Sequence, residues 1–102
     1  MAKLLVLYAP PKDPDAFEAH YRNTHLPLAR KVPGVKRIEI NAGPVLTPNG
    51  PAPYHLIGLL SFDSMAELQA GLASPEGQAA AADLANFAGA GVTLLLFEER
   101  EP

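Results

Sequence analysis

The sequence predicts an α+β protein in which one four-stranded antiparallel sheet carries its helices on a single face. Four short, β-prone apolar runs alternate with two regions of helical spacing, in the order β-α-β-β-α-β. Both helical regions begin with recognisable capping residues. A proline-rich stretch separates the two central strands, as expected for a loop or a wide hairpin connection.

The first half of the chain predicts a strand, a helix and a second strand. Residues 3–8 are apolar and short, which indicates a strand. Asp13-Pro14 supplies a capping side chain followed by proline at the first helical position, so a helix begins there. Residues 35–40 alternate charged and apolar side chains and predict a strand with one polar face. The apolar stripe of the helix is expected to include Phe17, Tyr21, Thr24 and Leu28.

The second half repeats this order after the proline-rich stretch of residues 42–53. Residues 54–62 predict the third strand and residues 92–99 the last. Between them, Ser64 and Glu67 form a capping-box pattern, and Ser74-Pro75 starts a further helical segment. The resulting order is that of the ferredoxin-like fold.

Three of the predicted strands are apolar on both faces, which bears on assembly. Residues 4–7, 56–60 and 94–97 do not alternate as they should in a sheet with one face in water. Two helices cover only one face, so we expect the other to meet a second copy, closing two sheets into a dimeric α+β barrel. The open alternative is that these short runs are misread segments of buried helix.

Composition limits the classes of function. The 102 residues are enough for a single domain, 1–102, and 48% of them are hydrophobic. There is no cysteine, which excludes disulfides and thiolate metal sites. A net charge of −3 without a basic cluster argues against nucleic-acid binding. No apolar run is long enough for a signal peptide or a membrane span, so a soluble cytoplasmic protein is expected.

His25 is the leading candidate for chemistry. Pro27 cannot donate a helical hydrogen bond, and its ring disfavours the helical region for Leu26, so the helix is expected to break there. His25 would then lie on the last turn of a helix, beside backbone that opens toward an apolar pocket between sheet and helices, with Gly58 and Gly77 leaving space nearby. Histidine exchanges a proton near neutral pH. The alternative is a histidine that only stabilises a helix C-terminus.

Other residues are weaker candidates for substrate binding. Tyr21 lies one helical turn before His25 and either flanks the same opening or is simply core. His55 either lines the pocket or bonds backbone at a sheet end. Asp83, among alanines, either partners a pocket group or lies on the surface. His20 is expected to be solvated, and no ligand spacing among the histidines indicates a metal site.

These residues resemble the EthD family of dimeric α+β barrel proteins. The resemblance rests on Asp13-Pro14-Asp15-Ala16-Phe17, on Tyr21 with Thr24-His25-Leu26-Pro27-Leu28-Ala29, and on Val32-Pro33-Gly34. A second block runs from Ser74-Pro75-Glu76-Gly77-Gln78 to Asp83 and Phe87. Together the blocks span most of the chain, and the proline-rich loop lies outside the pattern.

The resemblance implies two ferredoxin-like subunits with facing sheets, and a pocket in each subunit between sheet and helices. The namesake is associated with the breakdown of ethyl tert-butyl ether beside a cytochrome P450 system, and the family is often filed under oxidoreductases. The wider superfamily includes cofactor-free monooxygenases, muconolactone isomerases and haem-degrading enzymes, and fold analogy does not choose among them.

Two functions follow as hypotheses. The first is a small enzyme without tightly bound cofactor or metal, acting on a small hydrophobic, oxygen-bearing compound in the breakdown of xenobiotics or aromatics. Its chemistry would be of oxidoreductase or isomerase type, with His25 as proton shuttle and Tyr21, Thr24, His55 and Asp83 around the substrate. The second is a non-catalytic protein that binds a small hydrophobic ligand for a partner oxidoreductase.

Overall fold

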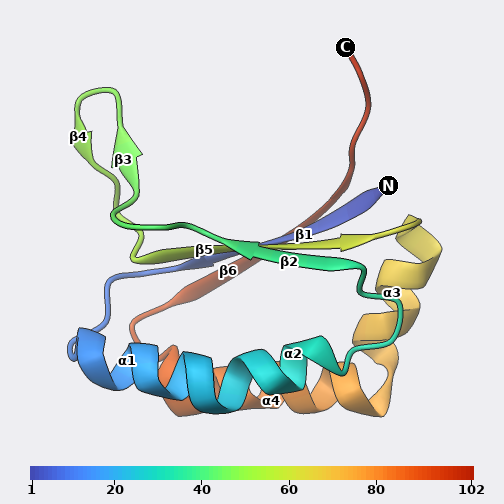
Figure 1. The fold of residues 1–102 in the computed structure, drawn as a ribbon, viewed down its shortest axis with the longest axis horizontal. Helices are drawn as coiled ribbons and strands as arrows, with labels where there is room; N and C mark the ends of the chain where they lie inside the picture. The colour runs from blue at the N-terminus through green and yellow to red at the C-terminus, as the bar shows by residue number, and fades with distance from the viewer.

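A computed structural model describes residues 1–102 and has the predicted order of elements, with one additional hairpin. The four main strands form an antiparallel sheet in the order β2-β5-β1-β6. All helices lie on one side of this sheet (Figure 1). The elements are β1 (Ala2–Tyr8), α1 (Pro14–His20), η1 (Tyr21–His25), α2 (Leu26–Arg30), β2 (Arg37–Ile40), β3 (Leu46–Thr47), β4 (Gly50–Pro51), β5 (Leu56–Phe62), α3 (Met65–Ala73), α4 (Pro75–Phe87) and β6 (Val92–Glu98).

The ferredoxin-like α+β fold is therefore confirmed, with strand ends within about two residues of those expected. The proline-rich stretch contains the two-stranded hairpin β3–β4, which rises on the side of the sheet away from the helices (Figure 1). None of the helices combines the length and the hydrophobicity that a membrane-spanning helix needs.

The helices begin where the capping residues predicted. The Asp13 carboxylate accepts a hydrogen bond from the Ala16 backbone N–H, at 3.1 Å. The Ser64 hydroxyl does the same for Glu67, at 3.1 Å. Side-chain caps of this kind satisfy backbone donors that have no partner within the first turn.

The expected break at Pro27 is wrong, because the helix continues through it as a wider π-turn. Leu26 keeps helical dihedral angles (φ −59°, ψ −42°), and its N–H donates to the Tyr21 carbonyl, five residues back. Proline in a regular α-helix loses a hydrogen bond and clashes with the carbonyl four residues earlier. A turn with one extra residue relieves that conflict, so His25 lies inside a continuous helix rather than at its end.

The two faces of the sheet carry alternate residues of the same strands. Leu4, Val6 and Tyr8 of β1 are buried beneath the helices. Leu5 and Leu7 point to the opposite, uncovered face, since side chains alternate along a strand. The register places Leu59 and Leu95 opposite Leu5 on that same open face. Apolar side chains therefore occupy both faces, as the sequence predicted.

Candidate active site

A narrow apolar pocket lies between the sheet and the helices. The space open to the centre of a water-sized sphere is about 60 Å³, and 14 of its 17 lining residues are hydrophobic. Tyr8, Tyr21 and His25 bring polar groups to the lining. Apolar pockets with few convergent polar groups are typical of small-molecule sites. The pocket predicted near His25 is therefore present.

The two glycines expected to leave space behave differently. A Cβ placed on Gly58 would lie 3.8 Å from the Val6 Cβ, an ordinary contact, so Gly58 leaves room in the pocket wall. A Cβ on Gly77 would collide with the backbone of Gly71 and Leu72. Gly77 does line the pocket, but the lack of a Cβ there also permits the close approach of α4 to α3.

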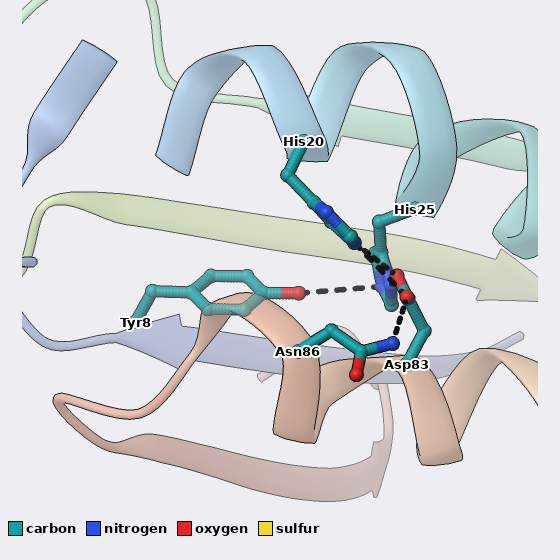
Figure 2. Close-up of polar contacts among 5 residues, drawn as sticks. All are labelled: Tyr8, His20, His25, Asp83 and Asn86. Atoms are coloured by element: carbon teal, nitrogen blue, oxygen red, sulfur yellow. Dashed lines mark hydrogen bonds and ion pairs between the residues drawn. The ribbon is translucent and has the colours of Figure 1, made fainter. Parts of the chain in front are cut away.

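Asp83 is at the centre of a polar cluster that reaches this pocket through His25. Its side chain on α4 is buried and accepts hydrogen bonds from three neighbours (Figure 2). His25 Nδ1 lies 3.0 Å from Oδ2, and Asn86 Nδ2 lies 2.9 Å from Oδ1. His20 Nε2 lies 2.9 Å from Oδ1 and 3.0 Å from Oδ2. A buried carboxylate is tolerated in an apolar helix face because these donors surround it.

The cluster fixes the charge of Asp83. Burial disfavours the carboxylate, but the hydrogen bonds from Asn86, His20 and His25 outweigh burial and lower the pKa of Asp83 below its ordinary value. Asp83 is thus ionised near neutral pH.

For His25 the balance favours the neutral ring. Burial lowers the pKa of His25, and this effect exceeds the opposing hydrogen bond and charge of Asp83. An ionised carboxylate only accepts hydrogen bonds, so neutral His25 must carry its proton on Nδ1. Nε2 is left without a proton, so its lone pair can accept one. The arrangement is that of an imidazole base oriented by a carboxylate.

Tyr8 lies next to that unprotonated nitrogen. Its hydroxyl is 3.5 Å from His25 Nε2, a long hydrogen bond. Burial, followed by the neighbouring Tyr21 and the charge of Asp83, raises the pKa of Tyr8 well above its ordinary value of 10.0. The hydroxyl therefore stays protonated and can donate to an oxygen atom bound between it and His25.

The π-turn η1 sets the direction of His25. Phe17, Tyr21, His25 and Ala29 are all buried and follow one another at intervals of four residues. In a regular α-helix each such step overshoots a full turn by about 40°, so the stripe would drift off the sheet. The wider turn over residues 21–25 corrects part of that drift and keeps His25 facing the pocket.

The other sequence candidates divide into two groups. Tyr21 lines the pocket, with its ring centroid 5.7 Å from that of His25. Thr24 is exposed on the outer side of the helix and does not line the pocket. His55 precedes β5, where its N–H donates to the Tyr8 carbonyl and its Nε2 lies 3.1 Å from Glu18. It too lies outside the pocket.

Sequence reasoning missed three members of the cluster. His20 was expected to be solvated but is held by Asp83, because α1 packs beside α4 at this point. Tyr8 gave no signal, since only the fold brings the end of β1 beside His25. Asn86 did give a sequence signal, because it stands three residues after Asp83, a spacing at which side chains on a helix interact.

Metal binding has no geometric support here. No group of three or more histidine, cysteine, aspartate or glutamate side chains is arranged to hold a metal ion. The third histidine, His55, is engaged with Glu18 rather than with the other two.

Comparison with known proteins identifies the family. The profile of the EthD domain matches residues 9–91. The chain belongs to the EthD family. A curated relative from Rhodococcus erythropolis, described as an uncharacterized 11.0 kDa protein in the thcB-thcC intergenic region, is 46% identical over 97% of this chain and 95% of its own length.

Solved structures agree with this assignment. An EthD family protein from Bacillus halodurans is 37% identical, with a TM-score of 0.90 over 98% of this chain and 99% of its own. A dimeric ferredoxin-like protein of unknown function from Thermobifida fusca is 15% identical over 94% and 88% of the two chains, with a TM-score of 0.68. SnoaB, a cofactor-independent oxygenase from Streptomyces nogalater, is 16% identical over 99% and 94%, with a TM-score of 0.67. The last two show the shared fold alone.

Proposed function

We propose that this chain is a small enzyme that moves a proton on a small hydrophobic, oxygen-bearing compound, without a tightly bound cofactor. The observation that carries the proposal is the pairing of His25 with Asp83. The carboxylate holds Nδ1–H at 3.0 Å, which leaves Nε2 as a base beside the Tyr8 hydroxyl in an apolar pocket.

The proton transfer assigns one role to each group. His25 Nε2 removes a proton from a carbon next to a carbonyl, or from an enol or phenol oxygen. For the carbon acid, the C–H bond breaks, the N–H bond forms, and the electron pair moves to the carbonyl oxygen as an enolate. Asp83 stabilises the imidazolium that results, and the Tyr8 hydroxyl donates to the enolate oxygen.

The fate of the enolate separates the two reaction types. Where a further double bond is conjugated with the enolate, return of the proton to a different carbon of that system gives an isomerase-type reaction. Alternatively, molecular oxygen takes the electrons of the enolate, a C–O bond forms at its carbon, and the imidazolium returns the proton to the resulting peroxide. This oxidoreductase-type reaction needs no cofactor, and SnoaB is described as a cofactor-independent oxygenase. Both begin with the same proton abstraction, so His25 is required for either. A place in the breakdown of xenobiotic or aromatic compounds belongs to the same proposal.

The pocket lining supports a mainly apolar ligand with a single oxygen-bearing group. Leu4, Val6 and Leu60 line its sheet side, and polar groups gather near Tyr8 and His25. Tyr21 is placed to pack against such a ligand. The same apolar lining also favours a second candidate, a binding protein that holds a hydrophobic compound for a partner oxidoreductase and performs no chemistry itself.

A homodimer through the open sheet face is part of the proposal. Leu5, Leu59 and Leu95 lie together there with no helix over them, and apolar surface of this kind is normally buried against a partner. Several relatives of the same fold are described as dimeric. The single domain 1–102 and the cytoplasmic location stay predictions from the sequence.

Deuterium exchange tests the catalytic role. The protein is incubated in D2O with a panel of small cyclic ketones, lactones and phenols, and loss of substrate C–H signal is followed by NMR, with and without oxygen. We expect His25→Gln to slow exchange by about 10²–10⁴-fold, the usual contribution of a positioned base.

His55→Gln is the matched control, because it removes an imidazole that lies outside the pocket. Circular dichroism checks that both variants are folded. If His25→Gln keeps full turnover, His25 is not the base. If wild type binds panel members by native mass spectrometry but exchanges none, the binding-protein function replaces the enzyme.

A further inference from the structure

His20 shares Asp83 with His25 but faces a different environment. Its Nε2 contacts both carboxylate oxygens, at 2.9 and 3.0 Å, and its ring stacks on Phe87 with centroids 4.9 Å apart. The side chain of His20 is 28% exposed, against 9% for His25. The proton transfer proposed above makes no use of His20.

The exposed edge of His20 opens into a surface groove between the start of α1 and the end of α4. Lys12, Asp13 and Asn86 line this groove with His20. Asp83 thus joins two imidazoles with different access to protons: His25 faces the apolar pocket and His20 faces water. Figure 2 shows both rings converging on the one carboxylate.

One carboxylate carries one negative charge, so it can fully neutralise only one imidazolium. A proton on His20 therefore weakens the stabilisation that Asp83 gives to a protonated His25. Like charges close together on a shared partner also repel each other.

We propose that His20 is a positioning residue for the reaction in the pocket: through Asp83, its protonation in the surface groove sets the basicity of His25. Neutral His20 leaves the whole carboxylate charge to His25, which is then an effective base. Protonated His20 takes up part of that negative charge, so His25 becomes a weaker base. This inference rests on the proposed function, because it concerns the same base.

The other charged groups near His20 do not reproduce this effect. Lys12 and Asp13, from the segment before α1, line the groove with opposite charges, and both are exposed to solvent. Their opposite charges partly cancel each other's effect on His20, and salt screens the remainder. Asp83 of α4 and His25 of η1 are the titratable groups in the buried cluster that His20 contacts directly or through one residue.

Two opposite substitutions test the coupling. Gln at position 20 can still donate a hydrogen bond to Asp83 but never gains charge, whereas Arg donates and is always charged. The imidazole signals of His25 are titrated by NMR in wild type, His20→Gln and His20→Arg, with His55→Gln as control. We expect the His25 midpoint to move to higher pH in His20→Gln, to lower pH in His20→Arg, and to stay unchanged in His55→Gln.

A purely structural role for His20 would shift both variants in the same direction or neither, and either result overturns the proposal. Because the two substitutions carry opposite predictions, one folded variant is still informative if the other fails to fold. The acid limb of the deuterium-exchange rate should follow the same shifts.

The outcomes also separate this inference from the proposed function. If His25→Gln abolishes exchange but the His25 midpoint ignores residue 20, only the coupling is wrong. If His25→Gln leaves exchange intact while the midpoint still responds to residue 20, the coupling is real and the catalytic role is wrong.

Discussion

The two faces of the sheet are made from alternate residues of the same strands and present opposite chemistry. On the covered face, Val6 and Tyr8 line an apolar pocket together with His25, whose ring is held by the buried carboxylate of Asp83. On the open face, Leu5, Leu59 and Leu95 lie side by side, and none of the cluster around Asp83 reaches them.

The difference teaches how a small chain separates two tasks. Polar chemistry needs a dry, closed environment in which each buried group has a partner, and the helices provide it. Assembly needs an apolar surface without helices over it. A strand period of two residues lets a single strand such as β1 serve both tasks at once.

The largest expected effect comes from a substitution that places a charge on the open face. In Leu95→Asp, a symmetric dimer would bury one unpaired carboxylate from each protomer. The free energy of dimerisation should therefore become less favourable by several kcal/mol, and the dimer should dissociate. The matched control is Leu96→Asp, on the other face of the same strand and similarly exposed (41% against 47%). Light scattering across a dilution series measures both. A wild-type protein that is monomeric and folded at micromolar concentration would remove the dimer from the account.

The next largest effect comes from removing the central carboxylate of the polar cluster on the covered face. Asp83→Ala leaves the donors of His20, His25 and Asn86 without their common acceptor, which should lower the free energy of unfolding by about 1–3 kcal/mol. Urea unfolding measures it. Asp63→Ala is the control, because Asp63 is exposed and pairs only with exposed Lys36, so little change is expected. Equal stability of the two variants would mean that the cluster contributes nothing to folding.

The sequence predicted the open face better than the covered one. Apolar runs without alternation, and the caps at Asp13 and Ser64, depend on neighbours within a few residues, so local patterns identify them. The contacts that Asp83 makes with His20 of α1 and His25 of η1 join distant parts of the chain, so no local pattern predicts them. The expected break at Pro27 failed for a related reason: proline excludes a regular α-turn, but a π-turn satisfies the same constraint without ending the helix.

The pH dependence of stability sharpens the description of the covered face. Because burial lowers the pKa of His25 below its ordinary value of 6.5, the unfolded state binds the proton first as the pH falls. The free energy of unfolding should therefore decrease as the pH falls through and below 6.5, by at most about 1.4 kcal/mol per pH unit for one proton. In His25→Gln this slope should be shallower. A steeper or unchanged slope would show that His25 is not buried in its neutral form.

At higher and lower pH the same reasoning applies to the neighbours of His25. Asp83 has a lowered pKa, so its contribution is present above the ordinary value of 3.8 and is lost as the pH falls further. Tyr8 has a raised pKa, so stability should fall as the pH rises above 10.0, where the unfolded chain ionises first. Tyr8→Phe should flatten the alkaline decrease.

The smallest expected effect concerns the pocket wall. Gly58→Ala places a methyl group 3.8 Å from the Val6 Cβ, an ordinary contact distance. The fold should therefore be kept, or gain about 0.4–1 kcal/mol of stability from the less flexible unfolded chain. The pocket becomes smaller. Native mass spectrometry should therefore show weaker binding of the bulkier panel compounds in Gly58→Ala. Unchanged binding across the panel would place the ligand away from Gly58.

The central claim is that His25 is a neutral base whose Nδ1–H is held by Asp83 and whose unprotonated Nε2 faces the pocket beside the Tyr8 hydroxyl. Nitrogen-15 NMR of the imidazole rings at pH 7 tests it directly, because protonated and unprotonated ring nitrogens have well-separated shifts. The account predicts a protonated Nδ1 and an unprotonated Nε2 for His25. A His25 ring that is protonated on Nε2, alone or together with Nδ1, would contradict it.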